Sequence, residues 1–170
     1  YYILGDILYR KKEYKQAKHY TKLYIEGRDS LKNPFSYFPS KGDGYFILAN
    51  IEQGQKQYDD AIEHYHEAIH LWTSYYGTNN KKLLTAYREL ANIQLLTGNY
   101  EEGLSNLQTF LNKLIPDFKE DDILMNPALE EMPSNLLAID VLFNKAKLWK
   151  NYFQKEQDIG LLEHSISSYL

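Results

Sequence analysis

The chain has 170 residues, 44% of them hydrophobic and 25% charged, and this composition excludes an intrinsically disordered or collagen-like protein. It contains no cysteine, which excludes disulfides, thiolate zinc sites and cysteine nucleophiles. The net charge of −4 disfavours a nucleic-acid-binding protein, because phosphate contacts need a concentrated positive surface.

The ends of the chain show no targeting segment. No apolar run approaches the roughly 18 residues that span a bilayer, and no signal-peptide pattern opens the sequence. We therefore expect a cytoplasmic protein with no membrane partner. The chain starts at Tyr1 and stops at Leu170 inside apolar periodic patterns, so we expect that both ends are truncated.

The first expected element is an antiparallel helix pair over about residues 1–30. Its segment LGDILYRKKEYKQA, from Leu4, returns without gaps as LANIEQGQKQYDDA from Leu48 and as LANIQLLTGNYEEG from Leu90. Small residues let two helix backbones approach, and the tyrosine is expected at the turn between them. The repeated columns are Leu4, Leu48 and Leu90; Gly5, Ala49 and Ala91; Ile7, Ile51 and Ile93; Tyr14, Tyr58 and Tyr100; and Ala17, Ala61 and Gly103.

A loop is expected after this first pair. The stretch LKNPFSYFPSKGDG, residues 31–44, holds two prolines and two glycines, residue types that favour turns and loops. We therefore predict a connecting loop over residues 31–42, followed by a second helix pair over about 43–76.

The third helix pair is expected over about residues 82–114. Gly98 can adopt the left-handed conformation that ends its first helix, and Asn99 can cap its second. Two apolar stripes at helical spacing predict that the second helices of pairs two and three are buried on one side. These stripes are Ala61, Tyr65, Ala68 and Ile69, and Leu104, Leu107, Phe110 and Leu111.

An irregular connection and a fourth, divergent pair complete the chain. Residues 115–135 carry three prolines and an acidic cluster, which predicts a long connection. Residues 136–170 restore helical periodicity, with apolar positions in two successive stretches. These positions are Leu137, Val141, Ala146, Leu148, Trp149 and Phe153, then Ile159, Leu162, Ile166 and Tyr169.

The repeated columns resemble the tetratricopeptide repeat, whose consensus has the same small, tyrosine and alanine positions. The resemblance implies an all-α fold, an α-solenoid of antiparallel helix pairs, with residues 1–170 forming a single solenoid domain. Ala17, Ala61 and Gly103 are 44 and 42 residues apart, against about 34 residues in the common repeat. This spacing looks like the 42-residue variety found in kinesin light chains and many bacterial signalling proteins.

The last half of the chain, residues 83–170, is similar to the repeats that precede the caspase-like protease of bacterial CHAT proteins. In that family an acidic connection with an asparagine-proline-small-leucine element precedes a leucine- and alanine-rich helix. The similar positions here are Asn126, Pro127, Ala128 and Leu129, then 136–148, then Leu162, Glu163, Ile166 and Tyr169. The resemblance implies a downstream effector domain in the same chain, whose catalytic residues would lie beyond Leu170.

The resemblance also implies where a partner binds. First helices line the inner face of such a solenoid, and Asn50 and Asn92 hold equivalent places on it. A carboxamide both donates and accepts, so it can bond the backbone of an extended peptide; alternatively, these asparagines only solvate the groove. We expect a partner-binding face formed by Phe46, Asn50, Gln53, Arg88, Asn92 and Leu95.

Some tetratricopeptide domains clamp a terminal carboxylate with lysines and asparagines on successive first helices. The equivalent places on the first helix here hold Tyr2 and Asp6, so we expect that this clamp is not made and that a terminal carboxylate is not the ligand.

No catalytic or metal site is expected. Glu63, His66 and His70 share one helical face, but nothing identifies the fourth ligand and supporting shell that a zinc site needs. The basic stripe Lys15, Lys18 and Lys22 is interpreted as a solvated helix face. We expect a non-enzymatic protein without a cofactor.

The function predicted from sequence is a scaffold or regulatory arm that binds a protein or peptide. The resemblance favours the arm of a CHAT-type signalling protein. The alternatives are the sensory domain of a bacterial histidine kinase or transcription regulator, and a stand-alone adaptor. Exposed solenoid ends would also permit self-association.

Overall fold

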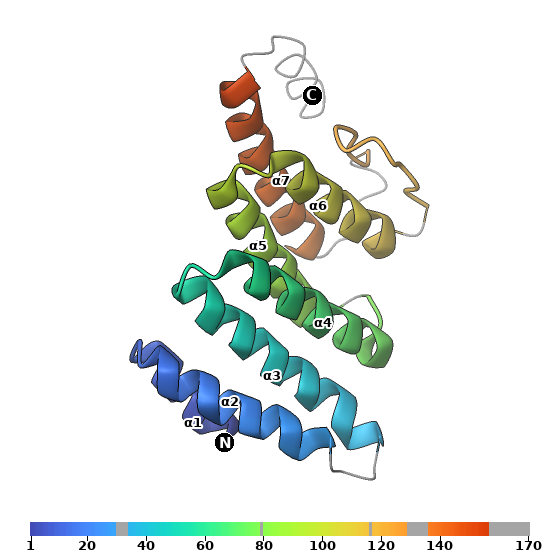
Figure 1. Cartoon of the computed structure of the whole chain (residues 1–170). Coiled ribbons are helices and arrows are strands. Elements are labelled where there is room, and N and C mark those ends of the chain that lie inside the picture. Colours follow the sequence, from blue (N-terminus) through green and yellow to red (C-terminus); the bar gives the residue numbers. More distant parts are fainter. Residues whose placement is uncertain (30–33, 79, 116, 129–135, 157–170) are drawn as a thin grey trace. The chain divides into compact units, whose positions relative to one another are not determined.

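The computed structural model describes residues 1–29, 34–78, 80–115, 117–128 and 136–156. This described part contains seven α-helices and no strand, so the predicted all-α helical repeat fold is confirmed (Figure 1). The helices are α1 (Tyr2–Arg10), α2 (Tyr14–Asp29), α3 (Pro34–Gly54), α4 (Tyr58–Tyr76), α5 (Lys81–Thr97), α6 (Tyr100–Leu114) and α7 (Leu136–Glu156). No helix in these ranges is long and apolar enough to cross a membrane.

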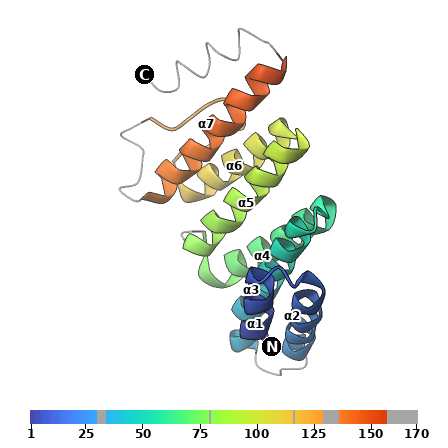
Figure 2. The same ribbon diagram turned by 90° about the vertical axis from the view of Figure 1, so that its left-hand side faces the viewer.

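The chain divides into two compact units, Tyr1–Ala86 and Tyr87–Leu170. The first unit contains α1 to α4 and the start of α5; the second contains the rest of α5, then α6 and α7. In the first unit α1 packs on α2, α2 on α3, and α3 on α4, as the ribbon shows in two views (Figures 1 and 2). The sequence predicts a single solenoid domain, and its continuity through both units stays a prediction.

The three predicted turns share one backbone conformation. Lys12, Lys56 and Gly98 have φ values of 62°, 62° and 77°, the left-handed conformation that ends a helix. In each turn the next residue donates its N–H to a carbonyl five residues earlier, as Asn99 does to Gln94 over 2.9 Å. The predicted side-chain cap is wrong, because the Asn99 side chain makes no capping hydrogen bond.

The repeated small residues lie where helices meet. Ala17 and Ala61 are fully buried, and Gly103 is buried as well. A Cβ atom on Gly103 would lie 2.8 Å from a methyl carbon of Leu148 on α7, closer than carbon atoms pack. The repeated tyrosines Tyr14, Tyr58 and Tyr100 are the first residues of α2, α4 and α6.

The loop predicted over residues 31–42 is wrong for residues 34–42, which belong to α3; residues 31–33 lie outside the described part. Pro34 is the first helical residue, where no amide donor is needed. Gly42 and Gly44 are buried contacts rather than turn residues. A Cβ atom would lie 2.7 Å from the Trp72 ring at Gly42 and 2.7 Å from Ile25 at Gly44.

A buried ionic cluster joins three helices of the first unit. Glu52 of α3 is 1% exposed. Its carboxylate accepts a hydrogen bond from His64 Nδ1 of α4 at 2.6 Å. It also forms an ion pair with Lys18 of α2 at 2.9 Å. Burial acts to raise the Glu52 pKa, but these two partners outweigh it and lower it. The bond to Glu52 raises the His64 pKa.

In the second unit, α6 packs on α7, and the Tyr87 and Phe110 rings stack with centroids 4.6 Å apart. Lys145 of α7 is 1% exposed and donates to Gln108 on α6 and to the carbonyl of Met125 and the side chain of Asn126 in the connection. Burial lowers the Lys145 pKa to about 7. The second helix predicted within 136–170 lies outside the described residues.

Candidate functional site

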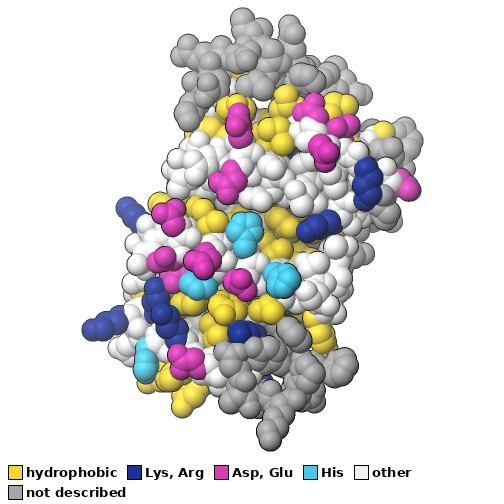
Figure 3. Space-filling view, turned by 45° about the vertical axis from the view of Figure 1, so that its right-hand side comes forward, with side chains coloured by type: hydrophobic (Ala, Val, Ile, Leu, Met, Phe, Trp, Pro, Cys, Tyr) yellow, Lys and Arg dark blue, Asp and Glu magenta, His cyan; other side chains and the backbone are white. Residues whose placement is uncertain are grey.

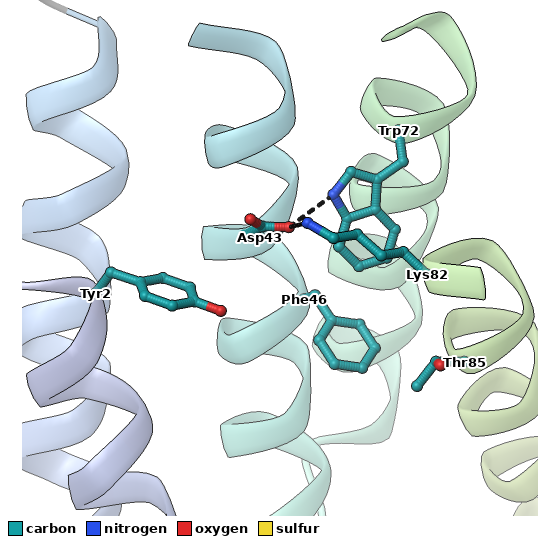
Figure 4. Close-up of a pocket in the computed structure, with 6 residues that line it drawn as sticks. All are labelled: Tyr2, Asp43, Phe46, Trp72, Lys82 and Thr85. Carbon is teal, nitrogen blue, oxygen red and sulfur yellow. Dashed lines mark hydrogen bonds and ion pairs between the residues drawn. The ribbon is translucent and has the colours of Figure 1, made fainter. Parts of the chain in front are cut away.

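Four helices of the first unit line one pocket (Figure 4). Its cavity measures about 190 Å³, below the 300–1,000 Å³ or so of pockets that hold a whole small ligand. A single side chain of a partner is a better match to this size. The lining residues are Tyr2 of α1, Asp43 and Phe46 of α3, Trp72 of α4, and Lys82 and Thr85 of α5.

Two polar groups meet at one end of the pocket. The first carboxylate oxygen of Asp43 accepts a hydrogen bond from Trp72 Nε1 at 3.0 Å and an ion pair from Lys82 Nζ at 2.5 Å. Asn80 fixes the start of α5, because its side-chain oxygen accepts the backbone N–H of Lys82 at 2.8 Å, a typical helix cap. The Asp43 carboxylate and the Lys82 ammonium are therefore paired with each other before any partner arrives.

The Lys82 ammonium also lies over two aromatic rings. Its nitrogen is 5.4 Å from the centroid of Trp72 and 5.5 Å from that of Tyr76. Both distances are within the roughly 6 Å over which a cation and a ring attract each other. Carboxylate and rings together already hold one ammonium group.

Phe46 forms the apolar floor of the pocket. Its ring contacts those of Tyr65 and Trp72, with centroids 5.6 and 5.4 Å apart. Trp72 is 2% exposed and Tyr65 is fully buried, so Phe46 rests on rigid neighbours. Rigid aromatic groups favour binding because they lose little freedom when a partner arrives.

Tyr2 stands opposite Phe46, and its hydroxyl points toward that ring, with Asp43 drawn above it (Figure 4). Partial burial raises the pKa of its hydroxyl, and the nearby carboxylates of Asp43 and Asp6 raise it further. Both carboxylates therefore contribute negative electrostatic potential at the Tyr2 hydroxyl.

The other predicted binding residues of the first unit are tied to the core. The Tyr65 hydroxyl lies 2.6 Å from Asn50 Oδ1 and 2.6 Å from Gln53 Oε1. A hydroxyl donates a single hydrogen, so it bonds one of these two oxygens at a time, and the other carboxamide keeps both its acceptor and its donor for a peptide backbone. The predicted role of Asn50 as donor and acceptor for a peptide backbone stays a prediction.

The remaining predicted residues, Arg88, Asn92 and Leu95, belong to the second unit. Arg88 is exposed and pairs with Glu89 at 3.4 Å, and Asn92 donates to the same carboxylate at 3.3 Å. Leu95 is half-buried. Whether these three side chains share one face with Phe46 stays a prediction.

The histidines of α4 do not gather at the pocket. His66 and His70 are exposed, and histidine side chains lie among acidic ones on the face in Figure 3, whereas His64 binds Glu52. In the described residues, no group of three or more histidine and carboxylate side chains is placed to hold a metal ion.

Sequence reasoning found Phe46 but missed most of its neighbours. Trp72 continues the stripe Tyr65, Ala68 and Ile69 at helical spacing, so the pattern contained a signal for it. Tyr2 occupies the same repeat column as Phe46, which places it on the same face. Asp43 directly follows the predicted loop and belongs to no repeated column, so no pattern pointed to it.

The family model of the tetratricopeptide repeat matches residues 45–111. This stretch covers the C-terminal half of α3, all of α4 and α5, and most of α6. Such repeats generally mediate protein–protein interactions and are typically non-enzymatic. No curated protein matches the chain.

Proposed function

We propose that this chain, whose residues 45–111 match the family model of the tetratricopeptide repeat, is a scaffold that binds an extended segment of a partner protein and takes one partner side chain into the pocket beside Phe46. One observation carries the proposal: rigid aromatic rings and a fixed pair of opposite charges converge on a cavity of about 190 Å³. Pockets of this composition, apolar with a few placed polar groups, are typical binding sites.

The energetics indicate a partner segment rather than a single residue. Full burial of one large apolar side chain contributes about 1.5–3 kcal/mol, whereas a micromolar dissociation constant needs about 8 kcal/mol. Further contacts along α3 must supply the difference. The carboxamides of Asn50 and Gln53 follow Phe46 at helical spacing and are suited to bond a peptide backbone, each hydrogen bond contributing about 0.5–1.5 kcal/mol.

Filling the pocket tests this function. Peptides would be selected from a displayed random library against the whole chain, and their dissociation constants measured by fluorescence anisotropy. Thr85→Trp places a large ring at the pocket wall and should weaken the selected peptides at least about tenfold, the loss of one anchor. Ser74→Trp is the matched control on an exposed position of α4 and should leave affinity unchanged. Equal affinity for both variants, at unchanged helicity, would refute the pocket.

The wider context belongs to the same proposal. We place the chain in the cytoplasm as the arm of a larger CHAT-type protein, because residues 83–170 resemble the repeats before such proteases. Asn126 of the resembling element is held by Lys145 at 3.1 Å, which gives that element a structural role in the second unit.

The coding sequence beyond residue 170 tests this context. A caspase-like domain with a histidine and a cysteine would support it. A phosphoacceptor helix or a helix-turn-helix would favour a kinase or a transcription regulator instead. An immediate stop codon would leave a stand-alone adaptor.

A further inference from the structure

We infer that the pocket beside Phe46 selects a basic residue of the partner, arginine or lysine, whose charged group binds the free oxygen of Asp43. The inference rests on the proposed function and specifies the chemistry of its anchor. It opposes the alternative in which Lys82 captures a partner carboxylate.

The first argument is the uneven use of the Asp43 carboxylate. Trp72 and Lys82 both bond to Oδ1. In the described part of the chain, no residue donates a hydrogen bond to Oδ2, which projects away from Lys82 (Figure 4). A carboxylate has about four acceptor positions. A further donor can therefore bind without displacing either existing partner.

The second argument is that the pocket's own cation is already engaged. Lys82 Nζ pairs with Asp43 at 2.5 Å and lies over the rings of Trp72 and Tyr76. A partner carboxylate would have to compete with Asp43 and the two rings for this ammonium. A partner cation instead meets an acceptor that is partly unoccupied.

The third argument is the sign of the charges around Tyr2. Tyr2 and Asp43 line the same pocket, and the carboxylates of Asp43 and Asp6 both raise the pKa of the Tyr2 hydroxyl. Arg10 pairs with Asp6 at 2.9 Å, but the Arg10 side chain is 74% exposed, and exposed pairs of this kind contribute little and rearrange readily. A guanidinium or ammonium entering the pocket meets the Asp43 carboxylate and the Tyr2 hydroxyl oxygen, whereas the negative potential of Asp43 and Asp6 repels a carboxylate.

The apolar part of the pocket suits the stem of such a residue. Lysine and arginine bury their methylene groups on apolar surfaces while the charged end reaches polar partners. Phe46 and Trp72 provide that surface, and Asp43 lies three residues before Phe46 on α3. The cavity of about 190 Å³ accommodates one long side chain.

The indole N–H of Trp72 offers a direct readout, because it donates to Asp43. Its NMR signal would be followed in the whole chain during titration with capped peptides Gly-Ser-Ala-X-Ala-Ser-Gly, where X is arginine, norleucine or glutamate. Trp149, in the second unit, supplies an internal reference signal. We expect the arginine peptide to shift the Trp72 signal saturably and to bind about tenfold more tightly than the norleucine peptide, as expected for a charge-assisted bond.

Asp43→Asn keeps an acceptor for Trp72 and removes the charge. It should reduce the arginine preference to within about twofold and leave the norleucine peptide unaffected. Equal binding of arginine and norleucine peptides in the native protein would overturn the inference while leaving the proposed apolar anchor intact. Tighter binding of the glutamate peptide would assign recognition to Lys82 instead. No Trp72 shift with any peptide would overturn both proposals.

Discussion

Lys56 adopts a left-handed conformation, with φ of 62°, that costs an L-residue about 1–2 kcal/mol. The equivalent turn in the next repeat uses Gly98, which adopts it without that cost. Replacing Lys56 by glycine should therefore raise the free energy of unfolding by about 0.5–1 kcal/mol. The gain is smaller than the steric cost because glycine loses more conformational entropy than lysine when the chain folds. Urea denaturation followed by circular dichroism measures this change.

The reverse substitution is the matched control for this turn. Gly98→Ala should lower the free energy of unfolding by about 1 kcal/mol, because alanine meets the same steric cost. If Lys56→Gly proved destabilising, the shared conformation of the two turns would be wrong.

The cluster of Lys18, Glu52 and His64 should make stability depend on pH in two windows. The His64 pKa is raised in the folded state, so its contribution is complete below about pH 6.5, the usual value, and is lost as pH rises through the raised pKa. The Glu52 pKa is lowered, so its contribution is present above about pH 4.3 and is lost as pH falls through the lowered pKa.

His64→Gln tests the upper window. A hydrogen bond between charged groups contributes about 1.5–3 kcal/mol. The free energy of unfolding of the native chain should therefore exceed that of the variant by about this amount at about pH 5.5 and by less at about pH 8.5. Chemical denaturation at the two pH values gives both differences. His66→Gln, at an exposed position of the same helix, should show no such change; an equal effect of both substitutions would contradict the role of Glu52.

This cluster could not be predicted from sequence. The sequence pattern assigned no role to His64, which belongs to no repeated column. Its partner Glu52 is 12 residues away on α3, and Lys18 is a further 34 residues back on α2. Polar partners that meet across helices depend on tertiary packing, which periodicity does not encode.

At the scale of the helices, the glycines of α3 should be required for packing. A Cβ atom at Gly44 would lie 2.7 Å from Ile25 of α2 and 3.1 Å from Tyr24. Gly44→Ala should therefore destabilise the chain by about 1–3 kcal/mol through overpacking. Urea denaturation monitored by Trp72 fluorescence in a Trp149→Phe background reports on this unit.

Gly27 in α2 supplies the matched control, because a Cβ atom there would meet nothing within 4 Å. Gly27→Ala should stabilise the chain by about 0.5–1 kcal/mol, the difference in helix propensity. Equal effects at the two positions would show that the approach of α2 and α3 does not depend on Gly44.

Sequence patterns predicted the start of three helices but misplaced the start of α3. The tyrosine columns mark the first residues of α2, α4 and α6, because this position combines a turn with a helix contact. In α3, proline and glycine suggested a loop, yet Pro34 begins the helix and Gly42 and Gly44 allow close packing. Glycine occurs both in loops and at close contacts between helices, and only the neighbouring helices decide which of the two a given glycine serves.

For the molecule as a whole, the repeat pattern identified one wall of the candidate site. Phe46 was predicted from its place in the repeat. Its acidic neighbour Asp43 and the ammonium of Lys82 join it only because α3 and α5 both reach the same pocket. The sequence thus predicts a binding face, whereas the chemistry of the pocket depends on residues outside the repeated columns.

The most direct test of the partner-binding pocket is photo-cross-linking. A selected peptide would carry photo-methionine in place of its anchor residue, and the attachment sites on the whole chain would be identified by mass spectrometry. We predict attachment to Tyr2, Phe46, Trp72 or Thr85, and loss of this attachment with Thr85→Trp. Attachment confined to the exposed face of α4, or to Arg88, Asn92 and Leu95, would contradict the proposed pocket.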